Sequence, residues 1–200
     1  QPSFSLAYSS NQTDDLSTLG YGWNVPVPYI ERINKQGVED LYNKTYFSSS
    51  LDGELASTTS TQYGTKIENG DFRKYTFATS TSGWTVTDKA GKIYKFGTAS
   101  SARLSAPNNS YKVFRWYLEE VRDTNDNYIS YSYFKDNGQV YIATSTYTGT
   151  GSTAGPFKVE FYHEPRSDRA SSSLPGFSVQ SRFRINEIQV KINGSWVRKY

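Results

Sequence analysis

The sequence predicts an all-β protein, an antiparallel meander of many short strands joined by hairpins, on three observations. Aromatic residues make up 16% of the 200 residues and Tyr alone counts 17, and aromatic side chains fit the pleated, half-buried surface of a sheet. Short runs alternate between apolar and polar residues, which is the periodicity of a strand. Turn-forming residues separate these runs.

The alternating runs follow one another along the chain, beginning with PSFSLAYSS (2–10), where Phe4, Leu6 and Tyr8 share one face of a strand. The later runs are KYTFA (74–78), GWTVTD (83–88), KIYKFG (92–97), YKVFRWYLEEVRD (111–123), NYISYSYFKD (127–136), QVYIATSTY (139–147), FKVEFYHE (157–164), RFRINEIQVKI (182–192) and SWVRKY (195–200). Each is predicted to be a strand. LEEVRD could begin a helix, but the aromatic residues on both sides of it favour strands.

The turns between these runs are predicted from their chemistry. Asn-Gly pairs tolerate positive φ and mark two-residue hairpins, and the chain has them at 69–70, 137–138 and 193–194. DKAGK (88–92) suits a slightly longer turn with Gly91 in the left-handed conformation. Such turns indicate antiparallel pairing between successive strands.

Residues 86–94 and 121–129 resemble each other: each has a strand, an Asp that can cap the turn, polar turn residues and an aromatic strand. An internal repeat would explain the likeness, but any β-meander also produces such echoes. Three segments rich in small and polar residues are expected to be surface loops, at 97–110, 148–156 and 164–176.

The length suits one domain with a sizeable core, and residues 1–200 are expected to form a single β-rich segment. The sequence contains no Met and stops within the strand-like INGSWVRKY, so we expect a fragment of a longer chain. No apolar run is long enough to span a membrane, and no signal peptide is visible.

The formal net charge is +3, with the two signs interspersed, which differs from the basic stripe of a nucleic-acid-binding protein. The absence of Cys excludes disulfides, thiolate metal sites and thiol catalysis. It also favours a bacterial protein, because secreted animal domains of this size often carry disulfides.

Catalytic and metal-binding motifs find little support. His163 is the one histidine and stands at the end of FKVEFYHE. Without a GxSxG motif, a second His or a Cys, neither a Ser-His-Asp triad nor a histidine metal site is indicated, so we expect His163 to hydrogen-bond locally. DTNDN (123–127) has the oxygen-bearing side chains of a calcium loop, but Tyr128 and Phe134 stand where an EF-hand needs Gly and Glu. A turn is expected there.

The carboxylates do not form a recognisable pair. Glu119 and Glu120 are adjacent, so in a strand they face opposite sides and cannot act together as acid and base. Carboxylates could still converge from distant strands, as in a glycosidase. Asp52 and Glu54, like the acidic residues 39–40, are expected to be solvated turn residues.

The aromatic side chains leave two interpretations open. An exposed row of Tyr and Trp would bind carbohydrate or peptide, because flat rings with polar tips offer stacking faces. Rings turned inward would instead be core residues or cross-strand pairs.

Four segments carry motifs that occur together in one family. The first two fit P-x-L-x-L-x-Y-S-S and G-x-G-W-x-L-x-x-x-x-I-x-R at Pro2, Phe4, Leu6, Tyr8, Ser9, Ser10, Gly20, Gly22, Trp23, Ile30 and Arg32. SGWTVTDKAGKIYKFG (82–97) fits W-x-V-x-D-x-x-G-x-x-Y-x-F-G, and WYLEEVRDTNDNYISYSY (116–133) fits W-x-L-x-x-I-x-D-x-x-G-N-x-I-x-Y-x-Y. With GFSVQSRFRINEIQV (176–190), they resemble the N-terminal region of the SpvB/TcB family, the B components of bacterial toxin complexes, which are related to the Rhs and YD-repeat proteins.

The resemblance implies a β-rich scaffold whose strands help to form a hollow shell around a toxic C-terminal polypeptide. The meander would then be part of a larger β-sheet shell or a sandwich-like module. Asp126 stands where the family's second hairpin has Gly, and the family's long array of repeats is missing. The ADP-ribosyltransferase activity of some relatives belongs to a separate C-terminal domain, and its Glu-x-Glu motif does not occur here.

The stretch LGYGWNVPVPYIERI (19–33) combines loop residues with core residues, which suits a stiff corner between two strands. Gly20 and Gly22 would let the backbone bend closely around neighbouring strands, and Trp23 would fill the bend. Pro26 and Pro28 would hold an extended edge that lacks hydrogen-bond donors.

We therefore expect a non-catalytic structural segment of a bacterial Rhs/SpvB-type toxin or cell-surface protein, without cofactor or metal. Its partners would be the remainder of its own chain, including the C-terminal effector, and other toxin-complex subunits, with no nucleic acid and no membrane span. It would be secreted or lie at the cell surface, after a cytoplasmic stage before export. The expected packing anchors are Gly20, Gly22, Trp23, Trp84, Tyr94, Trp116 and Tyr131.

Two other functions remain open on the sequence. A carbohydrate- or protein-binding β-sandwich module, similar to an adhesin, would need aromatic side chains exposed along one face. A glycosidase-like hydrolase would need two carboxylates facing each other across a cleft.

Overall fold

The computed structural model describes residues 4–10, 17–20 and 22–200, so Pro2 and Tyr21 of the sequence motifs lie outside the described residues. Its contacts divide the chain into two compact units, where the sequence alone predicted one segment. Unit 1 comprises Gln1–Pro26 and Tyr128–Tyr200, and unit 2 comprises Val27–Asn127. The stretch VPVP (25–28) contains the first boundary between them.

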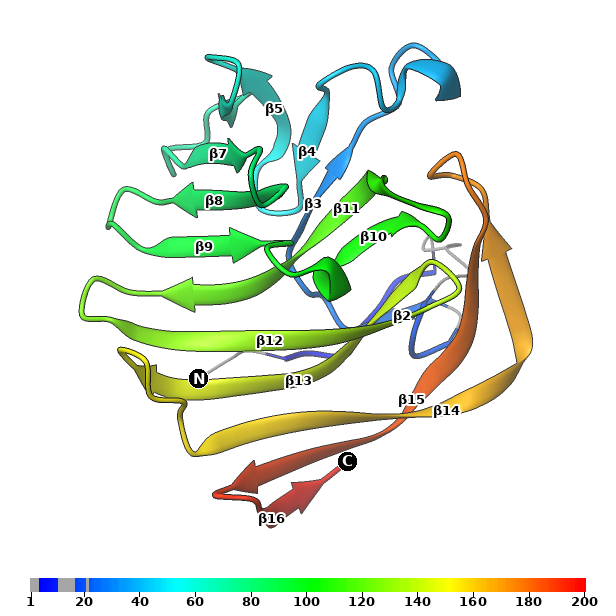
Figure 1. The fold of residues 1–200 in the computed structure, drawn as a ribbon. Coiled ribbons are helices and arrows are strands. Elements are labelled where there is room, and N and C mark those ends of the chain that lie inside the picture. Colours follow the sequence, from blue (N-terminus) through cyan, green and yellow to red (C-terminus); the bar gives the residue numbers. More distant parts are fainter. Residues whose placement is uncertain (1–3, 11–16, 21) are drawn as a thin grey trace. The chain divides into compact units, whose positions relative to one another are not determined.

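The regular secondary structure of unit 2 is almost entirely antiparallel strands (Figure 1). The strands are β3 (Tyr29–Arg32), β4 (Phe47–Ser49), β5 (Gly53–Ser57), β6 (Gln62–Thr65), β7 (Lys74–Ala78), β8 (Gly83–Thr87), β9 (Ile93–Phe96), β10 (Arg103–Ala106) and β11 (Asn109–Arg122). Two 3-10 turns, η1 (Val38–Asp40) and η2 (Ser100–Ala102), are the helical elements of the described part of the chain. Along that part, no helix has the length and apolarity to span a membrane.

Eight strands of unit 2, β3 to β9 and β11, close into a ring. Each strand from β3 to β8 pairs with the next one along the chain. β11 completes the ring, because its residues 115–117 pair with β3 and its residues 118–122 pair with β9. β10 lies outside the ring and pairs with the first half of β11. Closure leaves the paired strands of the ring without a free edge.

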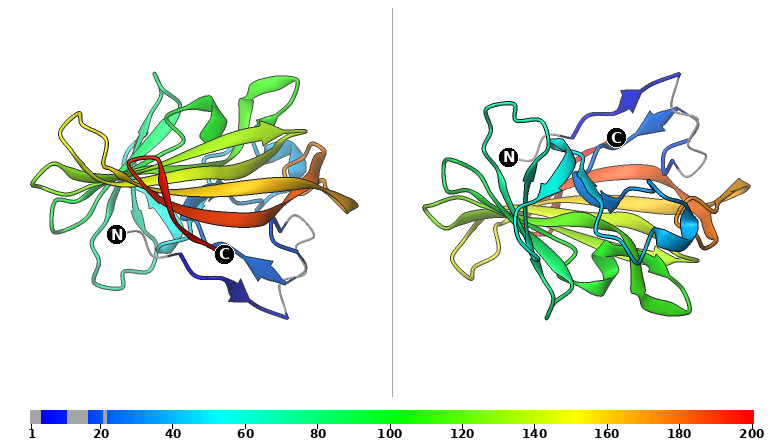
Figure 2. Two further views of the ribbon diagram at one scale, coloured as in Figure 1. Left: turned by 90° about the horizontal axis from the view of Figure 1, so that it is seen from below. Right: turned by 90° about the horizontal axis from the view of Figure 1, so that it is seen from above.

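Unit 1 contains a sheet of longer strands with the order β16-β15-β14-β13-β12. These strands are β12 (Asn127–Asp136), which begins at the unit boundary, β13 (Gln139–Thr150), β14 (Phe157–Ser172), β15 (Val179–Ile192) and β16 (Ser195–Lys199). A two-stranded ribbon of β1 (Ala7–Tyr8) and β2 (Trp23–Asn24) completes the unit and lies to one side of this sheet (Figure 2). The prediction of an all-β, antiparallel chain is confirmed.

Two of the three Asn-Gly hairpins are confirmed. Asn137 and Gly138 form the two-residue loop between β12 and β13 with φ of 44° and 81°. The 193–194 pair does the same between β15 and β16, with φ of 50° and 79°. The prediction for 69–70 is wrong, because these residues lie inside the eight-residue connection 66–73 between β6 and β7.

The two similar segments form the same five-residue turn. The carboxylate of Asp88 accepts hydrogen bonds from the N–H groups of Ala90 and Lys92, both at 2.9 Å. Asp123 accepts from the N–H groups of Asn125 and Asn127, again at 2.9 Å. The left-handed position is occupied by Gly91 in one turn and by Asp126, at φ 67°, in the other. The DTNDN segment is therefore a turn, as predicted.

Several predicted loops and strands differ from the structure. The segment 164–176 is mostly strand, because β14 continues to Ser172 and stays paired with β15 after an irregularity between Pro165 and Ala170. The segment 97–110 contains η2 and β10. At the start of the chain the strand is only two residues long, and the side chains of Leu6 and Tyr8 are 58% and 60% exposed. Alternation there did not indicate burial.

Each unit has its own apolar core. In unit 2 the side chains that point into the ring are buried, among them Ile30, Phe47, Leu55, Tyr63, Tyr75, Trp84, Val86, Phe96, Trp116 and Leu118. In unit 1 the buried side chains include Tyr133, Val140, Tyr141, Ile142, Val159, Phe161, Val179 and Ile185. Many of the aromatic residues of these strands are therefore core residues.

Candidate functional site

An aromatic cluster fills the ring of unit 2. Trp84 is 0% exposed and Trp116 is 1% exposed, and their rings meet edge to face with centroids 6.0 Å apart. Phe47 packs against both, at 4.8 Å from Trp84 and 5.9 Å from Trp116. Edge-to-face contacts of this kind are favoured by the ring quadrupoles. The two tryptophans chosen from the sequence as packing anchors thus lie side by side in the core.

The surroundings of Trp116 leave little free space. Its indole Nε1–H donates to the carbonyl oxygen of Ser82 at 2.8 Å. Gly97 adopts a φ of 56°, and a Cβ at this position would lie 2.3 Å from Cδ1 of Trp116. Glycine is therefore required at position 97 both for its conformation and for the close approach of the indole ring.

Arg32, the last residue of the second sequence motif, packs on this cluster. Its guanidinium carbon lies 5.1 Å from the ring centroid of Phe47 and 5.8 Å from that of Trp116. Its Nε donates to the carbonyl oxygen of Val113 at 3.0 Å, and its Nη1 donates to the carbonyl oxygen of Lys44 at 2.9 Å. Burial lowers the pKa of Arg32. The guanidinium therefore ties the loop after η1 to β11.

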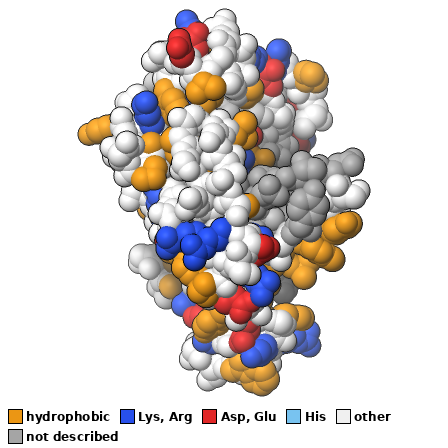
Figure 3. Space-filling model, turned by 90° about the vertical axis from the view of Figure 1, so that its right-hand side faces the viewer, with side chains coloured by type: hydrophobic (Ala, Val, Ile, Leu, Met, Phe, Trp, Pro, Cys, Tyr) orange, Lys and Arg blue, Asp and Glu red, His pale blue; other side chains and the backbone are white. Residues whose placement is uncertain are grey.

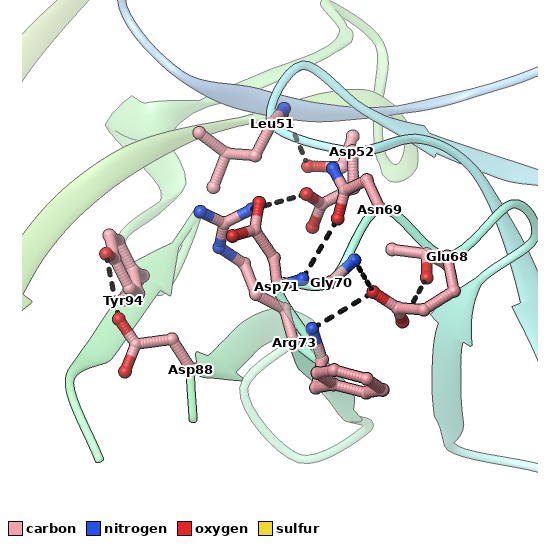
Figure 4. A network of polar contacts seen from close by, with 12 residues as sticks. Leu51, Asp52, Glu68, Asn69, Gly70, Asp71, Arg73, Asp88 and Tyr94 are labelled. Carbon is pink, nitrogen blue, oxygen red and sulfur yellow. Dashed lines mark hydrogen bonds and ion pairs between the residues drawn. The ribbon is translucent and has the colours of Figure 1, made fainter. Parts of the chain in front are cut away.

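A second polar network lies at the turn between β4 and β5 (Figure 4). The side chain of Asp52 is 0% exposed and pairs with Arg73. It also accepts a hydrogen bond from the hydroxyl group of Tyr75, whose oxygen lies 3.0 Å from Oγ of Ser49. Burial and the contact with Asp52 raise the pKa of Tyr75. The expectation that Asp52 is a solvated turn residue is wrong, because Arg73, which precedes β7, and Tyr75 of β7 enclose its carboxylate.

The connection 66–73 is fixed by a carboxylate. Glu68 accepts from the N–H groups of Gly70 at 2.7 Å and Phe72 at 3.2 Å, and from the hydroxyl group of Thr65 at 2.9 Å. Hydrogen bonds from the backbone hold the pKa of Glu68 below its usual value. Phe72 adopts a φ of 51° and is 66% exposed. Hydrogen bonds thus fix the backbone of this connection, although the ring of Phe72 is mostly exposed.

The geometry of these groups favours a structural role. Glu119 accepts from the N–H group of Ala99 at 3.1 Å, whereas Glu120 pairs with Lys95 and Arg122, both at 3.0 Å. The two glutamates share no partner, so they do not form an acid–base pair. Within the residues that the structure describes, no three His, Cys, Asp or Glu side chains are grouped to hold a metal ion.

In unit 1, the predicted corner residues adopt the expected backbone but not the expected packing. Gly20 and Gly22 have φ of 122° and 77°, and a Cβ at Gly22 would lie 2.8 Å from the Tyr8 ring. Trp23 does not fill a bend. Its side chain is 43% exposed and meets only the ring of Tyr8 among the ring contacts of the described residues, with centroids 5.2 Å apart. A side chain on a two-stranded ribbon has few neighbours, so its burial is incomplete.

The remaining two predicted anchors are half-buried. Tyr94 donates from its hydroxyl group to Asp88 at 3.3 Å. Tyr131 packs edge to face against Phe4, with centroids 6.3 Å apart. Burial raises the pKa of both tyrosines. Neither residue takes part in the aromatic cluster of unit 2, so the seven predicted residues do not form one site.

Unit 1 also has an apolar groove of about 410 Å³. Its lining includes Phe4, Leu6, Phe161, Ile188, Val190 and Tyr200. Other surface regions are mixed: on the face in Figure 3, acidic and basic side chains lie together in small groups near the top and in the lower part. The groove is the concave apolar feature that a binding function would use.

Comparisons with known proteins agree with the sequence motifs. The family model SpvB, described as Salmonella virulence plasmid 65kDa B protein, matches residues 58–155. The mono(ADP-ribosyl)transferase SpvB of Salmonella typhimurium is 26% identical over 165 residues, covering 68% of this chain and 27% of the relative. The protein of the same name from Salmonella choleraesuis strain SC-B67 gives the same values. The chain thus spans about a quarter of the length of these relatives.

Solved structures share the fold. The N-terminal domain of the effector protein SpvB from Salmonella typhimurium strain LT2 matches with a TM-score of 0.83 and 19% identity, over 94% of this chain and 82% of that chain. The Tc holotoxin pore of Photorhabdus luminescens gives 0.82 and 19%, and the TcdB2-TccC3 complex 0.80 and 18%, each over 94% of this chain and 12% of the other. The chain therefore resembles the N-terminal region of SpvB and TcB proteins.

Replacing Trp116 by Ala is expected to lower the free energy of unfolding by about 3–5 kcal/mol, because it leaves a cavity in the aromatic cluster. Trp23→Ala is the matched control and should cost about 1 kcal/mol, since its side chain is already 43% exposed. Urea unfolding followed by circular dichroism measures both losses. Equal losses in the two variants would contradict the described difference in burial.

Asp52→Asn is expected to destabilise the chain by about 3 kcal/mol, because it removes the carboxylate that faces a largely buried guanidinium. Asp71→Asn removes the other partner of Arg73, whose carboxylate is 43% exposed, and should cost at most about 1 kcal/mol. The comparison uses urea unfolding at pH 7. A larger loss for Asp71→Asn than for Asp52→Asn would show that the network is arranged differently.

Proposed function

We propose that the chain is a non-catalytic structural segment of a bacterial Rhs/SpvB-type toxin or surface protein, and that its strands contribute to a β-shell that encloses or presents a C-terminal effector. The observation that carries this proposal is the likeness of fold along 94% of the chain to the SpvB N-terminal domain and to the Tc toxin structures. The sequence motifs occur in the same order as in that family, which supports the same conclusion.

The physical character of unit 2 suits a wall element. The ring is closed, its interior is filled by aromatic side chains, and its buried carboxylate is engaged by Arg73 and Tyr75. A packed interior offers no room for a substrate, and the carboxylate of Asp52 is enclosed at 0% exposure, where a substrate does not reach it. These features stabilise the segment and leave chemistry to other parts of a toxin.

The proposal includes partners and a location. The segment would contact the remainder of its own chain and, in an assembled toxin, other subunits of the complex. It would act outside the producing cell, as a secreted or surface-bound protein. The relatives are named mono(ADP-ribosyl)transferases, but the aligned region covers 27% of their length, so we do not assign transferase activity to these residues.

Protection of cargo tests the proposal. Residues 1–200 would replace the matching region of TcdB2 in the TcdB2-TccC3 complex, and the complex would be treated with protease. We expect the hypervariable C-terminal region to resist the protease to the same extent as in the original complex digested in parallel, because the replacement has the same fold. Intact cargo on a gel is the measurement.

Two control complexes make this result interpretable. The same chimera with Trp116→Ala should lose protection, since the aromatic cluster of unit 2 is broken. The chimera with Trp23→Ala should keep it. Digestion of the cargo in a chimera that assembles and unfolds as cooperatively as the original complex would contradict the shell function.

A binding module is the second candidate, and the apolar groove of unit 1 is the observation in its favour. Aromatic side chains exposed in the same unit include Trp23, Trp196 and Tyr200, at 43%, 63% and 68%. Glycan-binding proteins use such rings as stacking platforms.

Tryptophan fluorescence against a panel of glycans separates the two functions. Under the structural proposal we expect no change, because no glycan would bind near the exposed Trp23 and Trp196, and the buried Trp84 and Trp116 are inaccessible to a ligand. Saturable quenching that disappears in Trp23→Ala or Trp196→Ala would favour the binding module. The two variants also identify which exposed ring the glycan contacts.

A further inference from the structure

His163 lies in a setting of unit 1 that its sequence position did not predict. It is inside β14 rather than at a strand end, opposite the buried Ile185 of β15. Its ring packs edge to face against Phe134 of β12, with centroids 5.0 Å apart, and against Tyr141 of β13 at 5.6 Å. The rings of Phe134, Tyr141 and Phe183 also pack on one another. We call His163 and these three aromatic residues the histidine cluster.

The side chain of His163 is half-buried, and one of its ring nitrogens is unsatisfied. Its Nε2 is inaccessible to solvent and has no hydrogen-bond partner within the described chain. The backbone of Phe161 hydrogen-bonds the ring through its other nitrogen. A neutral imidazole tolerates this arrangement, because an unprotonated Nε2 carries only a lone pair. A protonated ring would instead hold an N–H donor and a positive charge against aromatic carbon.

The charged groups on the neighbouring strands do not compensate such a charge. On β12 and β15, Asp136 pairs with Arg182 at 2.9 Å, and Glu164, beside His163 on β14, pairs with Arg184 at 2.7 Å. No carboxylate acts on the pKa of His163, which burial lowers below the usual value of 6.5.

The other polar groups near the ring are also engaged. On β13, the titratable group in contact is the phenol of Tyr141, and its oxygen accepts from the N–H groups of Arg182 at 2.9 Å and Phe183 at 3.4 Å. Lys135, also on β12, is exposed. Arg166, further along β14, is held by Asp168 and by the carbonyl oxygen of Ser17. The side chains in ring contact with His163, Phe134 and Tyr141, thus present no free acceptor to a charged imidazole.

We propose that His163 is an acid-sensitive switch of unit 1, in which protonation of the half-buried ring at its enclosed Nε2 opens the histidine cluster and loosens β14 from β13 and β15. The bistable element is the aromatic packing, since the ring can be charged only by leaving it. This inference concerns unit 1 alone and does not depend on the shell function.

The direction of the pH effect follows from proton linkage. In the unfolded chain the imidazole binds a proton near pH 6.5, whereas in the fold burial opposes binding. Unfolding therefore takes up a proton, and stability falls as the pH falls below about 6.5. The carboxylates whose pKa is depressed in the fold also stabilise it, but their contribution begins to fall only below about pH 4.5, where Glu and Asp of the unfolded chain are protonated. Between pH 5 and 7, His163 is the side chain that titrates.

The first experiment measures the ring and the stability of the complete 200-residue chain. NMR of the His163 ring C–H groups follows its titration, and urea unfolding at pH 7.5 and 5.5 gives the unfolding equilibrium constant. We expect a titration midpoint below 6.5 and a constant that rises by up to about tenfold at the lower pH. A midpoint at or above 6.5 would overturn the proposal, whether or not any variant folds.

Variants then assign the effect to this ring. His163→Phe keeps an aromatic ring in the cluster, and His163→Gln keeps a hydrogen-bond donor; neither titrates, so both should lose the change between pH 7.5 and 5.5. The double variant with His163→Phe and Ser167→His places a histidine on an exposed position of the same strand. It should behave as His163→Phe alone. A pH response that persists in all three would overturn the proposal.

Hydrogen exchange locates the opening. The N–H groups of Arg182 and Phe183, which donate to Tyr141, should exchange faster at pH 5.5 than intrinsic rates predict. The same groups in His163→Phe should show no such acceleration. Equal acceleration in wild type and variant would place the acid effect elsewhere and overturn the assignment to the histidine cluster.

Discussion

The edge-to-face contact between Trp84 and Trp116 is the interaction on which unit 2 depends. One indole belongs to β8 and the other to β11, the two strands that flank β9, so the contact joins two strands that do not pair with each other. Phe47 packs on both rings, and the guanidinium of Arg32 packs on that of Trp116. Gly97 has a positive φ and no Cβ, so the indole of Trp116 can approach its backbone closely. Strand closure, loop anchoring and backbone geometry are thus arranged around one aromatic contact.

Local features of this fold were predictable from the sequence because their causes are local. The 137–138 and 193–194 hairpins and the Asp-capped turns depend on residues within five positions of one another, and these were identified. The unit boundary and the closure of the ring were not, because β3 and β11 meet through residues 84 positions apart, as in the pair of Arg115 with Glu31. Alternation also failed at Leu6 and Tyr8, since period-two patterning predicts a strand face but not what covers it.

The candidate site shows the same limit. Trp84 and Trp116 stood out as large aromatic residues in strongly patterned strands, and burial was the natural expectation. Asp52 looked like an ordinary turn residue, because its partners, Arg73 and Tyr75, follow more than twenty positions later. The Arg-x-Tyr pair at the start of β7 was the available signal. For His163, only tertiary structure could show that rings from two other strands surround it.

The ring closure by β11 has a consequence for how the chain is made. A ribosome adds about 5–20 residues per second. The first strands of the ring, from β3 onward, are therefore synthesised several seconds before β11, the strand that pairs with both β3 and β9. During this interval β3 and β9 present open edges, and the face that will receive Trp116 is uncovered. Long-range pairing of this type is slow and prone to aggregation. Synthesis, rather than the finished fold, is therefore the stage at which this segment most needs a chaperone.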